Sequence, residues 1–224
     1  MTKYNSENMD NKIIENLRED YRSSTLNIED ITAKPMDQFK IWFEEALESK
    51  LLEPNAMTLA TCTPQGIPSA RIVLLKGFDS EGFVFYTNYL SRKGQEMIQN
   101  PSAALVFCWL ELQRQIRVEG WVERMSREES VAYFQSRPKS SQIGAWASHQ
   151  SNVIENRTIL EENVKSLEEE YKDVDQLPCP EYWGGLKLIP EKMEFWQGRT
   201  SRLHDRILYT FDENGHWKQE RLAP

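Results

Sequence analysis

The sequence lacks any apolar run long enough to cross a membrane. Its longest apolar stretches, such as positions 72–75 and 103–110, fall far short of the roughly 20 residues that a spanning helix needs. The first residues, MTKYNSENMDNK, are polar and contain no apolar core of the kind found in signal peptides. We therefore expect no membrane partner and a cytoplasmic location.

Residues that form disulfides or bind metals are also scarce. The three cysteines, Cys62, Cys108 and Cys179, are widely spaced without a CxxC pair, and the chain has only three histidines. This pattern predicts neither a disulfide framework nor a zinc site. We expect no bound metal.

Common catalytic signatures are missing as well. The chain contains no GxGxxG, GxxxxGKS/T, HExxH or GxSxG motif, which disfavours Rossmann, P-loop, zincin and α/β-hydrolase chemistry. The formal net charge is -8 and the sequence pI is about 5.1. Because nucleic-acid binding depends on a dominant basic surface, we expect no nucleic-acid partner.

What the 224 residues do contain is the pattern of one globular domain. We assign residues 1–34 to a polar N-terminal segment, partly disordered, with a short amphipathic helix over 10–22. Residues 35–224 form the main domain. Helical periodicity, caps and proline positions predict its helices at 36–50, 92–100, 127–136, 141–148 and 154–172.

Between these helices the sequence has the short alternating runs of β-strands. They lie at 56–62, 67–78, 83–88, 102–110, 112–125, 182–190, 192–198, 206–212 and 216–223, with a hairpin turn at Glu213-Asn214-Gly215. Strands joined by hairpins, with helices interposed rather than alternating, favour an antiparallel barrel in an α+β domain.

Several cations lie inside apolar β segments, where an unpaired charge is costly to bury. Arg71 and Lys76 bracket the run IVLL, and their odd separation places them on opposite faces of a regular strand. Ser91, Arg92 and Lys93 open a helix, which is a favourable place for a phosphate. The alternative for this segment is an ordinary capped surface helix with solvated cations.

Three further groups suggest a ligand. Gln115 lies on a glutamine-bearing strand face that suits a planar heterocycle, although an edge strand explains it equally well. Tyr133, Arg137 and Ser141 have i, i+4 and i+8 spacing, and they converge if the helical direction continues past Pro138.

The segment RLHDR carries the clearest functional signal. If it is extended, Arg202, His204 and Arg206 share one face near Trp196. A core histidine explains His204 alone, but not the whole set. Together these groups predict a phosphorylated planar cofactor and a phosphorylated planar substrate.

The same segments resemble the pyridoxamine 5'-phosphate oxidase family. The resemblance runs from about residue 35 to 224 and is carried by RIVLLK, FYTN with SRKG, SRPKSSQIGAWAS, YWGG, EFWQG, RLHDR and the terminal LAP. It implies a split β-barrel homodimer with FMN at the subunit interface. The implied reaction oxidises pyridoxamine or pyridoxine 5'-phosphate to pyridoxal 5'-phosphate, with dioxygen as electron acceptor and hydrogen peroxide as product.

The resemblance also implies residue roles. It assigns to FMN the residues Arg71, Ile72, Val73, Leu74, Leu75, Lys76, Tyr86, Thr87, Arg92, Lys93, Gln115, Gln150, Ser151, Trp196 and Arg206. It assigns to the substrate the residues Lys76, Tyr133, Arg137, Ser141, Arg202, Leu203 and His204, with Arg202 and His204 as the catalytic pair.

Two other functions stay open from the sequence. A non-catalytic split-barrel carrier or sensor would bind flavin or pyridoxal phosphate without turnover, because fold alone does not determine activity. An interaction module would use the acidic helix at 154–172 and bind no chromophore. The N-terminal segment departs from the family, since positions 23–30 read SSTLNIED where relatives often carry basic residues.

Overall fold

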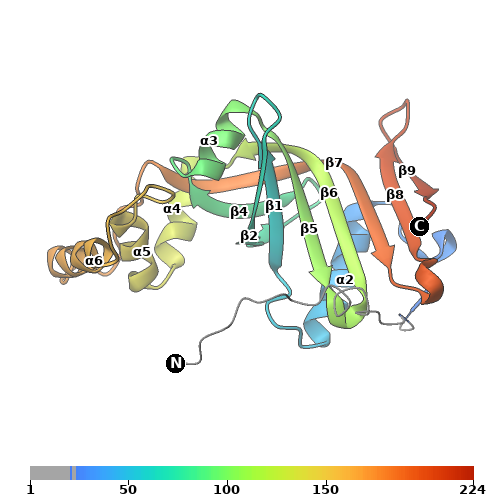
Figure 1. The fold of residues 1–224 in the computed structure, drawn as a ribbon, viewed down its shortest axis with the longest axis horizontal. Helices are drawn as coiled ribbons and strands as arrows, with labels where there is room; N and C mark the ends of the chain where they lie inside the picture. The colour runs from blue at the N-terminus through green and yellow to red at the C-terminus, as the bar shows by residue number, and fades with distance from the viewer. Residues whose placement is uncertain (1–20, 22–23) are drawn as a thin grey trace, which may run out of the picture.

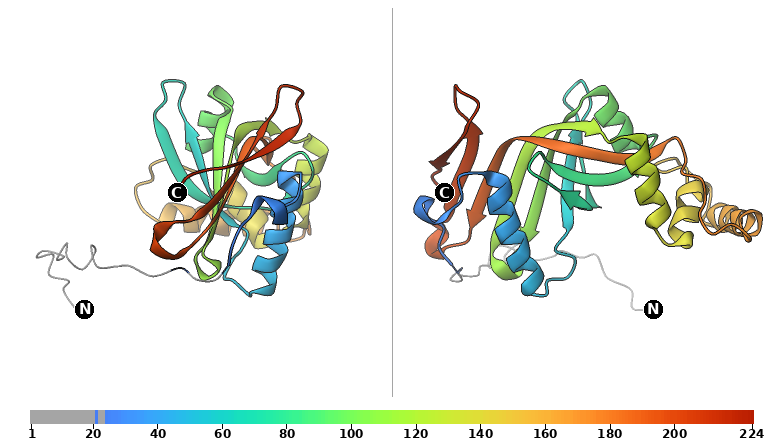
Figure 2. Two further views of the ribbon diagram at one scale, coloured as in Figure 1. Left: turned by 90° about the vertical axis from the view of Figure 1, so that its right-hand side faces the viewer. Right: turned by 180° about the vertical axis from the view of Figure 1, so that it is seen from behind.

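A nine-stranded antiparallel sheet forms the centre of the computed structural model, which describes Tyr21 and residues 24–224. The strand order is β2-β1-β5-β6-β7-β4-β3, and β8 joins β7 and is followed by β9. Figures 1 and 2 show that the sheet is strongly curled. The strands are β1 (Ala56–Cys62), β2 (Pro68–Leu74), β3 (Gly77–Phe78), β4 (Phe83–Asn88), β5 (Ser102–Trp109), β6 (Arg114–Arg124), β7 (Trp183–Gln197), β8 (Asp205–Phe211) and β9 (Trp217–Arg221).

The helices surround this sheet, as the α+β prediction requires. Helix α2 lies against the curled sheet, whereas α4, α5 and α6 project from the side opposite β8 and β9 (Figures 1 and 2). The helices are α2 (Pro35–Glu48), α3 (Arg92–Gln99), α4 (Arg127–Ser136), α5 (Lys139–Ala147) and α6 (Thr158–Glu170), with 3-10 turns at Ile28–Asp30, Leu110–Leu112 and Thr200–Arg202. The helix predicted over 10–22 lies outside the described residues except for Tyr21, which is not helical.

Local sequence signals explain where the helices begin. The Ser91 side chain accepts a hydrogen bond from the Gly94 backbone and so caps α3. Ser126 and Glu129 form the predicted reciprocal capping box at the start of α4. Pro35 occupies the first turn of α2, where its missing N–H costs nothing.

Two strand predictions were wrong in their boundaries. The predicted strand 67–78 is divided, because the chain leaves β2 after Leu74 and Lys76 N–H donates instead to Val84 of β4. The predicted strands 182–190 and 192–198 are one strand, β7. The register of β7 against β6 shifts at Gly120, which pairs with Pro190. This bulge accommodates the proline that suggested a break.

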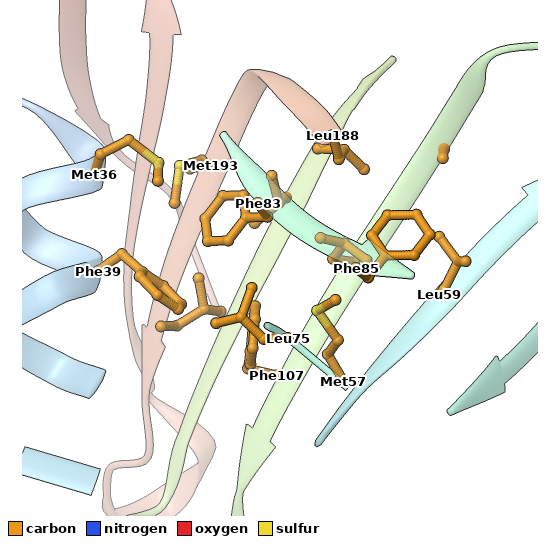
Figure 3. Packing of buried hydrophobic residues seen from close by; sticks show 14 of the residues in the cluster. Met36, Phe39, Met57, Leu59, Leu75, Phe83, Phe85, Phe107, Leu188 and Met193 are labelled. Carbon is orange, nitrogen blue, oxygen red and sulfur yellow. The ribbon is translucent and has the colours of Figure 1, made fainter. Parts of the chain in front are cut away.

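The main core fills the space between α2 and the sheet. Phe39 of α2 is fully buried, and its ring centroid lies 4.8 Å from that of Phe83 and 5.0 Å from that of Phe107. Figure 3 shows Phe39 and Met36 directed from the helix toward the strands. A smaller core under α4, α5 and α6 contains Phe134, Ile143, Leu177, Cys179 and Trp183. Among the described residues, no helix is long and apolar enough to span a membrane.

The Phe39 cluster supplies a test of the fold. We expect Phe39→Ala to lower the free energy of unfolding by about 3–5 kcal/mol, because it removes a fully buried ring and leaves a cavity. Urea unfolding of the purified protein measures this change. Leu52→Ala is the control, because Leu52 is 92% exposed and its replacement should change stability by less than about 0.5 kcal/mol. Equal stabilities for the two variants would contradict this account of the core.

Candidate active site

A cavity of about 500 Å³ opens between the sheet and helices α4 and α5. Its volume lies within the range of small-molecule sites. Residues from β2, β4, α3, α4, α5 and the start of β7 contribute to it, so it draws on segments far apart in the sequence. Its walls are Ile72, Val73, Leu74, Lys76, Tyr86, Thr87, Asn88, Lys93, Tyr133, Arg137, Ser141, Gly144, Ala145, Ser148, Gln150 and Trp183.

One wall of this cavity is aromatic. The ring centroids of Tyr86 and Tyr133 lie 3.8 Å apart with an interplanar angle of 18°, and Trp183 lies nearly parallel to both. The Arg137 guanidinium sits 4.8 Å from the centroid of the Trp183 ring, a cation–π contact. No role was predicted for Trp183, although the YWGG motif that contains it was part of the resemblance.

Two buried polar atoms on the cavity-lining residues have no hydrogen-bond partner within the described part of the chain. They are Arg137 Nη1 and Thr87 Oγ1. Arg137 Nη2 donates to the Ser141 carbonyl at 2.9 Å, which holds the side chain beside α5, and burial lowers the Arg137 pKa. Since unpaired buried donors are costly, these atoms favour a ligand that carries acceptor oxygens.

The beginning of α3 adds a cation to the same cavity. Lys93 Nζ donates to Gln150 Oε1 at 3.0 Å, and the Arg92 backbone N–H donates to Ser151 Oγ at 3.2 Å. Burial, assisted by the nearby Arg71 charge, lowers the pKa of Lys93 to about 8. The predicted phosphate site at this helix start therefore includes the segment after α5, which brings Gln150 and Ser151 to it.

The side chains of Arg71 and Lys76 lie in different surroundings. The cause is not the alternation along one regular strand that we predicted. Lys76 lies beyond the end of β2 and lines the cavity. Arg71 is directed toward Thr61, Ser69 and Glu96, where its guanidinium forms hydrogen bonds and an ion pair.

A second group of predicted residues surrounds Trp196. A cavity of about 200 Å³ is lined by Gln115 and Trp196, which are register partners on β6 and β7, together with Tyr21. The His204 ring centroid lies 4.5 Å from that of Trp196 and 5.8 Å from that of Tyr21. Sequence reasoning gave Tyr21 no ligand role, because the N-terminal segment departs from the family pattern.

The hydrogen bonding of His204 determines which ring nitrogen carries its proton. Nδ1 accepts a hydrogen bond from the Arg199 backbone N–H at 3.1 Å. Burial and the neighbouring Arg202 charge lower the His204 pKa below its ordinary value. A neutral imidazole with an accepting Nδ1 must carry its proton on Nε2. His204 is therefore a hydrogen-bond donor through Nε2.

The predicted single face of Arg202, His204 and Arg206 was wrong. Arg202 lies in a 3-10 turn with φ of 61°, and β8 begins only at Asp205. The turn changes the direction of the backbone, so an extended alternation does not apply. Leu203 is exposed in the same loop.

Arg206 occupies the first part of β8, opposite Trp196. Its Nε and Nη2 donate to the two carboxylate oxygens of buried Glu194 at 2.8 and 3.1 Å, and Nη1 donates to the Ala223 carbonyl. The bidentate pair fixes the plane of the guanidinium. The bond from Nη1 to the Ala223 carbonyl links the same side chain to the C-terminal segment.

The two groups lie toward opposite ends of β7. Trp183 lines the larger cavity and Trp196 lines the smaller one. At about 3.3 Å per residue, the two tryptophans are separated by roughly 43 Å along the strand. Figure 1 shows β7 running from the helical side of the molecule to the side that carries β8. A single chain therefore does not bring all the predicted residues together.

Comparison with protein families identifies both parts of the chain. Residues 43–170 match the model described as pyridoxamine 5'-phosphate oxidase. Residues 183–224 match the pyridoxine 5'-phosphate oxidase C-terminal dimerisation region. The second match contains Trp196, His204 and Arg206.

Similar sequences and structures agree with these matches. The chain is 57% identical over 211 residues to the pyridoxine/pyridoxamine 5'-phosphate oxidase of Microcystis aeruginosa, covering 94% of this chain and 98% of the relative. It is 53% identical over 213 residues to the enzyme of the same name from Trichormus variabilis, with 95% and 99% coverage.

Solved structures extend the similarity to the fold. PhzG from Burkholderia lata, solved in complex with tetrahydrophenazine-1-carboxylic acid, has a TM-score of 0.84 and 30% identity, covering 91% of this chain and 100% of that one. A pyridoxamine 5'-phosphate oxidase-related, FMN binding protein from Nostoc punctiforme has a TM-score of 0.66 and 19% identity, with 83% and 97% coverage. These similarities confirm the predicted split-barrel fold. The chain belongs to the pyridoxine/pyridoxamine 5'-phosphate oxidase family, a family of oxidase enzymes.

Proposed function

We propose that the protein is an FMN-dependent oxidase that converts pyridoxamine 5'-phosphate and pyridoxine 5'-phosphate to pyridoxal 5'-phosphate. Dioxygen is the electron acceptor and hydrogen peroxide is released; the amine substrate also takes up water and releases ammonia. The observation that carries this proposal is the larger cavity, in which the buried and unpaired Arg137 Nη1 and Thr87 Oγ1 accompany Lys76 and Lys93. Such a set of donors suits phosphorylated ligands.

The donors fall into two groups that suit two phosphates. Arg137, Tyr133, Ser141 and Lys76 would bind the phosphate of the substrate, with Arg137 as the bidentate donor. The phosphate of FMN would lie at the beginning of α3, bound by Arg71, Arg92 and Lys93 with Thr87, Gln150 and Ser151. The existing hydrogen bonds from Lys93 to Gln150 and from Arg92 to Ser151 support this second group.

A second copy of the chain would complete the site. Gln115, Trp196 and Arg206 lie at the far end of β7 from the larger cavity, within or beside the region that matches the dimerisation model. We propose a homodimer in which these residues contact the flavin bound by the partner. Arg202, Leu203 and His204 would then face the substrate ring.

The protein residues orient the reactants, while the cofactor supplies the electron transfer. When bound, FMN would supply the redox chemistry, as hydride acceptor for the substrate C4' carbon and electron donor to dioxygen. His204 holds its proton on Nε2 and donates it as a hydrogen bond to the substrate, rather than acting as a base. Two hydrogen bonds to Glu194 fix the orientation of the Arg206 guanidinium, which would provide a positive charge beside the flavin.

A non-catalytic carrier is the second candidate function. It would need the flavin-side residues but not the substrate-side donors Tyr133, Arg137 and Ser141. The burial of an unpaired Arg137 donor argues for a second phosphorylated ligand and therefore for the enzyme.

The visible absorption spectrum of the purified protein tests the proposed function. We expect flavin bands that bleach when pyridoxamine 5'-phosphate is added without oxygen and that return on exposure to air. Bands that never bleach would favour the carrier. A colourless protein that FMN does not reconstitute would contradict the enzyme.

Lys93 makes FMN binding sensitive to pH. Because only the protonated ammonium attracts phosphate, we expect affinity to fall as pH rises through about 8, the pKa of Lys93 in the free protein. Quenching of flavin fluorescence during titration of the apoprotein measures this affinity. Lys93→Met should bind FMN weakly at every pH and lose the step near pH 8. A step that persists in this variant would assign it to another group.

Arg137 should control substrate affinity. We expect Arg137→Met to raise KM for pyridoxamine 5'-phosphate by about 10–100-fold, the effect of losing a charge-assisted hydrogen bond, while FMN affinity is retained. Steady-state kinetics of the holoenzyme measure both KM and kcat. Lys139→Met is the matched control, because Lys139 bonds to the Lys172 carbonyl and does not line the cavity. An unchanged KM in Arg137→Met would contradict the substrate assignment.

A further inference from the structure

Glu96 of α3 is a buried carboxylate to which none of the roles above applies. It is 5% exposed and lies between Arg71 of β2 and Arg92 of its own helix. Its Oε1 accepts from Arg92 Nε at 2.8 Å, and its Oε2 faces Arg71 Nη2 at 3.4 Å. The hydroxyls of Thr61 and Ser69 each donate to Oε2 at 2.5 Å.

These contacts keep Glu96 ionised. Burial by itself raises the pKa of the carboxyl, but the hydrogen bonds from Ser69, Thr61 and Arg92 outweigh burial and lower the pKa to about 2. Glu96 is therefore ionised at neutral pH. Because each hydrogen bond or ion pair restrains both of its groups, Glu96 also restrains the side chains that contact it.

Glu96 is the carboxylate that the two arginines share. The Arg92 side chain is 61% exposed, and Glu96 is the only carboxylate within the described residues with which it forms an ion pair. Arg71 reaches the same carboxylate from a separate strand, and it also donates to Thr61 and Ser69. Without an anion between them, Arg71, Arg92 and nearby Lys93 would repel one another, and the exposed Arg92 would turn to solvent.

The charge balance of this cluster fits one phosphate monoester. Three cations, Arg71, Arg92 and Lys93, and one anion, Glu96, leave a net charge of two positive units. A phosphate monoester carries about −1.5 to −2 at neutral pH. Glu96 thus pairs with both arginines, and the cluster still has a net positive charge that can bind the phosphate.

We propose that Glu96 is a positioning residue that orients Arg71 and Arg92 toward the phosphate of FMN and so provides the preference for FMN over riboflavin. The inference rests on the proposed function, and it concerns a residue that does not itself touch the cofactor. It makes a prediction opposite in sign to simple electrostatics. Removing a negative charge from an anion site should tighten phosphate binding, whereas loss of positioning should weaken it.

The test compares two flavins that differ only in the phosphate. Full-length apoprotein of the wild type, Glu96→Gln and Glu96→Asp is titrated with FMN and with riboflavin, and binding is followed by quenching of flavin fluorescence. We expect both variants to bind FMN about tenfold more weakly, the lower end of what the loss of an outer-shell partner costs at metal sites. Riboflavin affinity should stay the same, because the isoalloxazine contacts are untouched.

The two variants distinguish the effect of the carboxylate charge from the effect of side-chain length. Glu96→Gln removes the charge and keeps the length, while Glu96→Asp keeps the charge but is too short to contact both arginines. Asp79→Asn is the matched control: Asp79 likewise forms an ion pair, with Lys187, but neither residue lines the cavity. It should leave the FMN-to-riboflavin ratio unchanged.

The remaining outcomes overturn the inference in distinguishable ways. An unchanged or tightened FMN affinity in both Glu96 variants, with normal wild-type binding, refutes the positioning role alone. A parallel loss of FMN and riboflavin affinity, or failure of both variants to fold, assigns Glu96 to general stability. A wild-type protein that binds neither flavin refutes the proposed function and this inference with it.

Discussion

The architecture depends on the double pairing of strand β7. One edge of this strand pairs with β6, while the other pairs first with β4 and then with β8. Those pairings join the strands near the helices to the strands near the C-terminus in one hydrogen-bonded sheet. The bulge opposite Gly120 makes this continuity feasible, because a Cβ at that glycine would lie 1.9 Å from the Ile189 carbonyl oxygen. Any larger residue would force the two backbones apart.

The same strand explains the division of the candidate site. Its first residues support the larger cavity, and its last residues carry Trp196 beside His204. A strand that is paired on both edges stays extended and does not fold back on itself, so residues toward its two ends do not meet within one chain. The requirement for a second chain in the proposed function is therefore a consequence of strand geometry. The match of residues 183–224 to a dimerisation region agrees with it.

Buried charge is organised differently in the two halves. Near the larger cavity, Arg137 is half-buried and has one buried, unpaired donor, and Lys93 has its pKa lowered by burial. Both features are costs that a bound anion would relieve. Near Trp196, Arg206 is already paired with Glu194, and His204 Nδ1 already accepts from the Arg199 backbone N–H. The residues near the larger cavity are therefore suited to an anionic ligand, whereas those near Trp196 are held in fixed orientations.

Helix starts were well predicted because their signals are local. Ser91 and Ser126 cap their helices and Pro35 lies in the first turn of its own, so each acts within one turn of a helix start. Strand boundaries were less accurate, because a proline can end a strand or occupy a bulge, and only the partner strand determines which. The strand predicted through Lys76 failed for the same reason: the Lys76 N–H bonds to Val84, not to a neighbour of Arg71.

The amino-acid sequence alone was enough to establish the α+β class, the capped helices, the family and the residue types of the candidate site. Each of these follows from periodicity, caps or motifs that are complete within a short segment. Folding of the whole chain was needed to place Arg202 in a turn before β8, Trp183 in the aromatic wall, and Glu96 between two arginines. Those facts depend on how distant segments are brought together, because a side chain's electrostatic partners are set by distance in space and not by separation along the chain.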